Sequence, residues 1–203
     1  MLAETVAYFS QIAVLELLAV ITAFAYVIFA AKEHILCWPS ALISTALYTY
    51  IFYDVYLWMD SLLQVYYFVM AIYGWYCWTK HKSNVKDICI HSLGATYHLK
   101  TVFFLAFVSI GVGYVMDNYT PTSFPYIDAA TTVYAVFATY LVTQKVLENW
   151  LYWVVIDLVS IYVYIEKGLS PTAMLFVVYV VIALVGYFTW LEKLKQTPEP
   201  ALN

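Results

Sequence analysis

The possible folds of this chain are limited above all by seven long apolar stretches. They cover residues 10–31, 39–55, 60–79, 99–116, 125–144, 149–166 and 171–191. About 20 helical residues cross a hydrocarbon core roughly 30 Å thick. Runs such as Ala173–Val185 do not alternate polar and apolar residues as barrel strands do. Because lipid offers no hydrogen-bond partner to an open backbone, the sequence predicts an all-α integral membrane protein with seven transmembrane helices.

Composition supports a membrane protein independently of these stretches. Apolar residues make up 65% of the 203 positions and charged residues only 11%, with a mean hydropathy of +0.79. A soluble domain carries roughly 25% charged residues. The net charge of −4 also argues against a nucleic-acid-binding surface.

The second half of the chain repeats the first at a constant offset of 112 positions (150 − 38 = 112). The strongest matches are two tryptophan pairs and one glycine pair: Trp38 with Trp150, Trp78 with Trp190, and Gly74 with Gly186. Residues 16–79 match residues 128–191, and one apolar stretch is left between them. Duplicated membrane units are a common plan of transporters.

This offset predicts a 3+1+3 arrangement of helices. We expect a first three-helix repeat in residues 1–79, a cytoplasmic loop with a linker helix in 80–123, and a second three-helix repeat with a short C-terminal tail in 124–203. A single linker helix returns the chain to its starting side. Both triplets then cross the membrane in the same direction, as parallel repeats do.

The lysines predict the orientation, since Lys-rich loops stay in the cytoplasm. Eight of the nine lysines fall on one side of this topology, and Lys167 alone falls on the other. We therefore expect the N-terminus outside and the C-terminus in the cytoplasm. The first ten residues carry no positive charge and no cleavage-like site, so we expect a retained span and not a signal peptide.

Several other functional classes lack their motifs in this sequence. It contains no GxxxxGK[ST] phosphate loop, its three cysteines lack metal-ligand spacing, and its four histidines lie in or beside predicted cytoplasmic loops. The seventh stretch has no lysine for retinal, and no intramembrane protease motif is present. We expect a protein that is not an enzyme and that has no cofactor and no metal.

Polar residues inside the apolar stretches are the candidates for function, because each is costly in hydrocarbon. The repeats differ at several of them: Asp157 opposite Thr45, Gln64 opposite Phe176, Asp60 opposite Thr172, Trp153 opposite Ala41, and Asn149 opposite Cys37. A binding site for an asymmetric solute requires such differences.

The sixth stretch carries Trp150, Trp153 and Asp157 on one helical face, at spacings of three and four residues. Two of them also have structural interpretations. Trp150 suits an anchor at headgroup depth, and Asp157 suits a hydrogen bond to a Ser or Tyr of a neighbouring helix. In the third stretch, Gln64 and Tyr67 share a face, and Asp60 suits a helix N-terminus.

Three segments carry a family resemblance. They are Trp38-Pro39, YDVYLWMDSLLQVYYFVMAIYGWYCW from Tyr53 to Trp78, and QKVLENWLYWVVIDLVSIYVYIEKGL from Gln144 to Leu169. With their LQxxY, GWYxW and ENWxxW motifs, they resemble the PnuC nicotinamide riboside transporters. One departure is WPSAL, where the family pattern has a glycine near Ala41.

This resemblance implies uptake of nicotinamide riboside, a vitamin B3 precursor for NAD biosynthesis, across a bacterial inner membrane. It also implies a fold like the full-length SWEET sugar carriers and a homotrimer. Transport would be facilitated diffusion with alternating access, and a cytoplasmic riboside kinase would trap the solute by phosphorylation.

The residues suit this solute, which carries a pyridinium cation, an amide and ribose hydroxyls. A desolvated cation over a tryptophan ring gains about 2 kcal/mol, and Asp157 can compensate the charge. The candidate substrate-binding residues are Trp38, Gln64, Tyr67, Gln144, Asn149, Trp150, Trp153 and Asp157. The chain has no arginine to clamp a phosphate. A nucleoside or sugar carrier of the same plan, with or without proton coupling through Asp157, remains the alternative.

Overall fold

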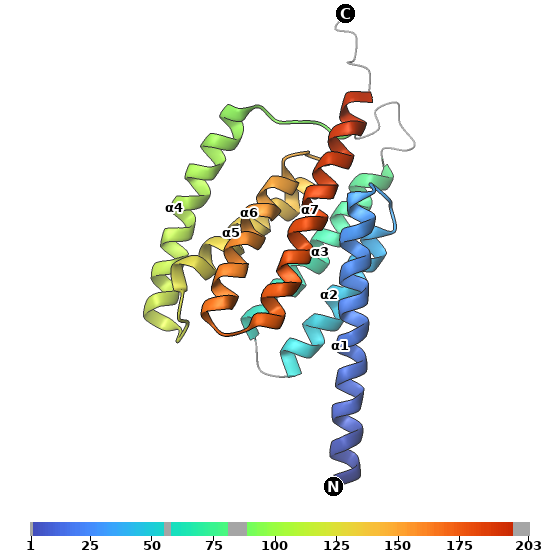
Figure 1. Cartoon of the computed structure of the whole chain (residues 1–203), viewed down its shortest axis with the longest axis vertical. Coiled ribbons are helices and arrows are strands. Elements are labelled where there is room, and N and C mark those ends of the chain that lie inside the picture. The colour runs from blue at the N-terminus through green and yellow to red at the C-terminus, as the bar shows by residue number, and fades with distance from the viewer. Residues whose placement is uncertain (1, 55–57, 81–88, 197–203) are drawn as a thin grey trace, which may run out of the picture. The chain divides into compact units, whose positions relative to one another are not determined.

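The structure, a computed structural model, describes residues 2–54, 58–80 and 89–196 (Figure 1). Within this part the chain forms seven helices and no extended strand. They are α1 (Leu2–Ala31), α2 (Cys37–Asp54), α3 (Trp58–Lys80), α4 (Ala95–Tyr119), α5 (Pro125–Thr143), α6 (Asn149–Glu166) and α7 (Ser170–Gln196). Each predicted stretch coincides with its own helix, except that residue 144 follows the end of α5 and residue 55 lies outside the described residues, so the all-α prediction is confirmed.

Three helices contain segments that are long and apolar enough to cross a membrane by length and composition. Among the described residues these segments are Val14–Ala31, Ala95–Tyr119 and Thr172–Gln196. They support a multi-pass membrane protein. The remaining helices are shorter or more polar, and their crossing of the bilayer stays a prediction.

The chain divides into two compact units, Met1–Ile88 and Cys89–Asn203. In the first unit, α2 packs against both α1 and α3. In the second unit, α6 packs against both α5 and α7, and α4 packs against α5. The middle helix of each predicted triplet therefore contacts both of its neighbours. The boundaries predicted at residues 79 and 123 stay predictions.

The turns that lead into α2 and α6 have the same conformation. Glu33 (φ 58°) and Lys145 (φ 55°), which are 112 positions apart (145 − 33 = 112), both adopt the left-handed conformation just past the end of a helix. The next amide in each turn bonds back to the helix: His34 N–H to Phe29 O at 2.8 Å, and Val146 N–H to Leu141 O at 3.0 Å. Both turns are Schellman motifs, which satisfy carbonyls at the helix end.

A tryptophan pair packs near the start of the middle helix in each unit. The rings of Trp38 and Trp78 meet edge to face, with centroids 5.1 Å apart and an interplanar angle of 87°. The Trp38 ring also fills the space in which a side chain at Gly74 would have to lie. Trp38 is almost fully buried. The tryptophan and glycine matches in the first repeat therefore form one packed contact.

The second unit contains the corresponding contact. Trp150 and Trp190 meet edge to face at 5.5 Å and 89°. A Cβ atom at Gly186 would lie only 2.8 Å from the Trp150 ring. The residues that match at the offset of 112 thus make equivalent contacts in the two units.

Proline and glycine lie at the ends of two helices. Pro125 begins α5, where its missing N–H removes no helical bond. Gly168 (φ 72°) follows α6, and the amide of Leu169 bonds back to Tyr164 O at 2.8 Å. Asp60 lies in the first turn of α3, as predicted. α2 begins at Cys37, two residues earlier than expected.

Candidate functional site

The predicted substrate-binding residues are divided between the two units. Trp38, Gln64 and Tyr67 belong to the first unit, and Gln144, Asn149, Trp150, Trp153 and Asp157 belong to the second. Four of the five in the second unit lie on α6. The α6 helix therefore carries the largest part of the predicted site.

Asn149 is the first residue of α6 and is fully buried. Its Nδ2 donates a hydrogen bond to Val146 O at 2.6 Å, which attaches the side chain to the preceding turn. Its Oδ1 is buried and has no hydrogen-bond partner among the described residues. An unpaired buried acceptor costs about 1–3 kcal/mol, so this oxygen is a candidate to accept a bond from a ligand.

Trp150 follows Asn149 and is only 3% exposed. Gly186 and Trp190 enclose its ring. Its buried Nε1–H has no acceptor in the described part of the chain. The ring is part of the packing of α6 against α7, and the indole N–H is its free polar group.

Trp153 lies one turn further along α6 and is partly buried. It packs against a small apolar cluster of Ala135 and Ala138 of α5 and Ile156 of α6. Tyr134 and Tyr152 border the same cluster. Unlike Trp150, Trp153 keeps part of its side chain accessible.

Asp157 is 5% exposed and lies near the middle of α6. No hydrogen bond or ion pair to its carboxyl group is found within residues 2–54, 58–80 and 89–196. The structural hydrogen bond considered from the sequence is thus not observed. Thr45, its counterpart in the first unit, donates to Ala41 O at 2.7 Å. A buried acid without a partner among the described residues is costly, and in a membrane-spanning helix, as α6 is predicted to be, it marks a candidate functional position.

Gln144 lies at the C-terminal cap of α5 and is half-buried. Its Nε2 is 3.2 Å from Thr143 Oγ1. The Gln144 backbone N–H bonds to Tyr140 O at 3.3 Å. Gln144 therefore lies in the turn that connects α5 to Asn149, the first residue of α6.

In the first unit, Trp38 is 1% exposed, and its Nε1–H has no acceptor among the described residues. Its ring lies 6.3 Å from that of Tyr26 of α1. Gln64 and Tyr67 are half-buried on α3. The Tyr67 ring packs edge to face against Tyr66 at 5.6 Å. The structure thus places these residues in the helical packing of their own unit.

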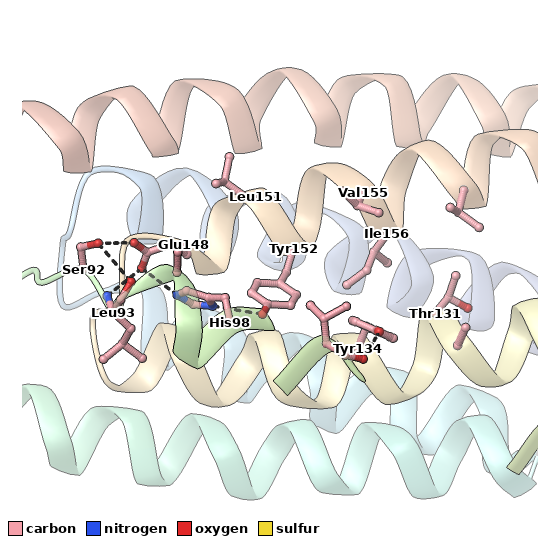
Figure 2. A pocket seen from close by; sticks show the side chains of 14 residues that line it. Ser92, Leu93, His98, Thr131, Tyr134, Glu148, Leu151, Tyr152, Val155 and Ile156 are labelled. Carbon is pink, nitrogen blue, oxygen red and sulfur yellow. Dashed lines mark hydrogen bonds and ion pairs between the residues drawn. The ribbon is translucent and has the colours of Figure 1, made fainter. Parts of the chain in front are cut away.

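The sequence did not predict a cavity of about 800 Å³ that α4, α5 and α6 line in the second unit. Its walls are mostly apolar and include Val102 from α4, Tyr134 from α5 and Val155 from α6. Figure 2 shows Tyr134 and Val155 among the side chains that line it. None of the eight predicted residues lines it. The cavity therefore lies beside the predicted site and does not include it.

Four polar residues form one end of this cavity: Ser92, His98, Glu148 and Tyr152. Glu148 Oε1 accepts a hydrogen bond from Ser92 Oγ, and Oε2 accepts one from Leu93 N–H at 3.3 Å. His98 Nε2 lies 3.4 Å from the same Oε2, an ion-pair distance at which the N–H is not aligned for a hydrogen bond. His98 Nδ1 is 3.1 Å from Tyr152 Oη.

One sequence signal was available for this cluster. Glu148 corresponds to Leu36 at the offset of 112 (148 − 36 = 112), so it is another polar position at which the repeats differ. Its partners could not be inferred, because Ser92 and His98 lie outside the repeated segments.

Known proteins resemble this chain over most of its length. The family described as nicotinamide mononucleotide transporter matches residues 13–192. The nicotinamide riboside transporter PnuC of Escherichia coli (strain K12) is 29% identical over 199 residues, which cover 86% of this chain and 83% of that protein. The riboflavin/roseoflavin transporter RibM of Streptomyces davaonensis is 24% identical over 137 residues, covering 66% of this chain and 64% of RibM.

A solved structure shares the fold. The crystal structure of the vitamin B3 transporter PnuC aligns with a TM-score of 0.74 at 22% identity, covering 96% of this chain and 88% of that one. The seven-helix architecture is therefore that of a known transporter. With the match over residues 13–192, the chain belongs to the PnuC family of membrane transporters, whose family description is nicotinamide mononucleotide transporter.

Proposed function

We propose that this protein carries nicotinamide riboside across a membrane. Its relative from E. coli is named for that solute and matches over 86% of this chain. Relatives of this family are named as transporters, which favours a carrier over an enzyme.

The observation that carries the proposal is the buried carboxyl group of Asp157, which has no partner among the described residues and lies on the same helix as two polar atoms that also lack one there. Asn149 Oδ1 lacks a donor and Trp150 Nε1–H lacks an acceptor within the described chain. Nicotinamide riboside carries a fixed positive charge that would pair with the Asp157 carboxylate. Its amide and hydroxyl groups would form hydrogen bonds with Asn149 Oδ1 and the Trp150 Nε1–H. Trp153 lies between them along α6 and offers an aromatic face to a flat cation.

The same chemistry favours the riboside over the mononucleotide. A phosphate group would bring negative charge to a site that holds Asp157 and would find no arginine anywhere in the chain. Lysine binds phosphate as a point charge but cannot form the bidentate contact. We therefore propose the unphosphorylated solute, although the family description names the mononucleotide.

The mode of transport follows from the resemblance. We propose facilitated diffusion with alternating access in a bacterial inner membrane, with a homotrimer as the working form. The N-terminus would lie outside, and a cytoplasmic riboside kinase would trap the solute for NAD biosynthesis. A proton-coupled nucleoside or sugar carrier is the second candidate, because Asp157 is a buried acid that can hold a proton.

Uptake of labelled nicotinamide riboside into vesicles that contain the purified protein tests the proposal. We expect saturable uptake that unlabelled riboside inhibits, with weaker inhibition by the mononucleotide, uridine, glucose and riboflavin. Empty vesicles and vesicles with the Asp157→Asn variant are the controls. Absence of riboside uptake, or stronger inhibition by uridine or glucose, would overturn the assignment.

The same vesicles test the energy coupling. With a pH-sensitive dye inside, facilitated diffusion predicts riboside uptake without a change of internal pH and without dependence on an imposed pH gradient. Internal acidification that accompanies uptake would establish proton coupling instead.

A further inference from the structure

The segment that leads into α4 is attached to the turn between α5 and α6. His91 N–H donates to Lys145 O at 3.2 Å, and Leu147 N–H donates to His91 O at 2.8 Å. These two bonds form an isolated parallel bridge between His91 and Val146. The buried side chains of Ile90 and Val146 lie within the two joined segments. Two chain regions about 55 residues apart are therefore held together just before α6 begins.

The Glu148 side chain strengthens this attachment. Its carboxylate meets Ser92 Oγ, Leu93 N–H and the His98 imidazole, and only 16% of the Glu148 and His98 side chains is exposed. Figure 2 shows His98 between Glu148 and Tyr152, to which its second ring nitrogen bonds. Hydrogen bonds to an ionised group are about twice as strong as neutral ones. We name Ser92, Leu93, His98 and Glu148 the α4–α6 clamp.

Glu148 occupies the N-cap position of α6, but its side chain makes no capping hydrogen bond to that helix. Short polar side chains such as Asp and Ser at this position commonly accept a bond from the helix's own first amides. Here the carboxylate bonds to the segment before α4 instead. The residues that follow it directly are Asn149 and Trp150, whose unpartnered atoms belong to the proposed substrate site.

The first unit shows that the turn itself does not require this carboxylate. Its turn has Glu33 in the left-handed conformation at the position equivalent to Lys145. Its Trp38 makes a ring contact equivalent to that of Trp150. At the position of Glu148 it carries Leu36, which is 47% exposed. The carboxylate contacts are therefore an addition to a turn that folds without them.

We infer that Glu148 is a positioning residue, which through the α4–α6 clamp holds Asn149 and Trp150 in place to bind the solute. The clamp also makes the starts of α4 and α6 move together. This inference rests on the proposed function only for the identity of the solute. The clamp acts on the first turn of α6, and Glu148 does not itself contact the riboside.

The test compares Glu148→Leu, which introduces the residue of the first unit, with Glu166→Leu, the same change at the exposed far end of α6. For Glu148→Leu we expect the KM for riboside uptake to rise about tenfold with the maximal rate nearly unchanged. Glu148→Gln keeps one acceptor oxygen and should restore part of the affinity. Ser92→Ala should add nothing further in the Glu148→Leu background, because both changes remove the same bond.

Hydrogen exchange of the Asn149 and Trp150 amides gives a readout without solute. Exchange should be faster in Glu148→Leu than in the unmodified protein and unchanged in Glu166→Leu. Unchanged exchange, or an unchanged KM in a protein that transports the riboside, would overturn the inference. Faster exchange in a protein that takes up no riboside would retain the clamp and reject the proposed solute.

Discussion

Trp150 and Gly186 approach so closely that a single added carbon at Gly186 would lie 2.8 Å from the indole ring. The equivalent pair in the first unit, Trp38 and Gly74, is tighter still. Both glycines let a tryptophan ring lie against a neighbouring helix and meet the next tryptophan edge to face. The two contacts hold the middle helix of each unit against the helix that follows it.

Alanine at either glycine should therefore destabilise the protein. A normal Gly→Ala change in a helix stabilises by about 1 kcal/mol, whereas forcing atoms into a packed interior costs about 1–3 kcal/mol. We expect Gly74→Ala to lower the thermal unfolding midpoint more than Gly186→Ala. The matched control is Gly111→Ala in α4, where an added carbon meets no atom within 4 Å.

The control variant should be as stable as the unmodified protein or slightly more so. If Gly74→Ala and Gly111→Ala melted at the same temperature, the tryptophan rings would not be confined as described.

Trp153 and Trp190 should separate binding from stability. Trp153 is partly buried beside the apolar cluster on α5 and α6, whereas Trp190 is fully buried against Trp150. Trp153→Ala should weaken riboside binding by about tenfold or more, since a cation over an indole gains about 2 kcal/mol. Trp190→Ala should cost about 3–5 kcal/mol of stability, as large truncations in a core do.

Titration of purified protein, followed by tryptophan fluorescence, gives the affinities, and thermal unfolding gives the stabilities. Equal small losses of affinity from both variants would contradict this separation.

The Asp157 carboxylate should favour a positively charged solute over an uncharged one. Asp157→Asn keeps the shape of the side chain and removes the negative charge, so it should weaken binding of cationic nicotinamide riboside by about tenfold. Binding of the reduced, uncharged dihydro form should change little. The stability should not fall, because no described residue pairs with this carboxyl group. Paired titrations with both solutes measure the effect.

Asp117→Asn is the control, because Asp117 is exposed near the end of α4. An equal loss of affinity for the charged and uncharged solutes would show that Asp157 acts through shape or packing and not through charge.

The elements of the fold could be predicted because lipid leaves the backbone few choices. Apolar runs located all seven helices, and the offset of 112 identified the tryptophans and glycines that make equivalent contacts in the two units. The helix ends were less predictable: α1 begins at Leu2 and α7 continues to Gln196, since a helix extends past its apolar part wherever its residues allow. The local sequence does not determine the residue at which such a helix begins or ends.

The site could be predicted only in part. Spacing alone placed Trp150, Trp153 and Asp157 on one helix, because helical periodicity is local. The Trp150 ring is buried against Gly186 of another helix, whereas the sequence suggested for Trp150 an anchor at headgroup depth or a contact with the solute. The α4–α6 clamp joins Ser92 to Glu148 across 56 positions, and no repeat or periodicity encodes such a contact.

The left-handed residues of the two equivalent turns give a further prediction. A residue with a side chain pays about 1–2 kcal/mol for this conformation, whereas glycine adopts it freely but loses about 0.5–1 kcal/mol more entropy on folding. Lys145→Gly should therefore leave stability unchanged or raise it by up to about 1 kcal/mol. Its backbone carbonyl would still accept the bond from His91. Lys100→Gly, in the exposed interior of α4, should instead lower stability by about 1 kcal/mol.

Glu33→Gly should behave like Lys145→Gly, because the two turns share one conformation. The reverse change, Gly168→Ala, forces a side chain into the same left-handed region after α6 and should destabilise by about 1 kcal/mol. Thermal unfolding of the four variants in one detergent shows whether the strain of the left-handed conformation or the folding entropy of glycine dominates in these turns. A loss from Lys145→Gly as large as that from Lys100→Gly would mean that the Lys145 side chain contributes more to the turn than its backbone strain costs.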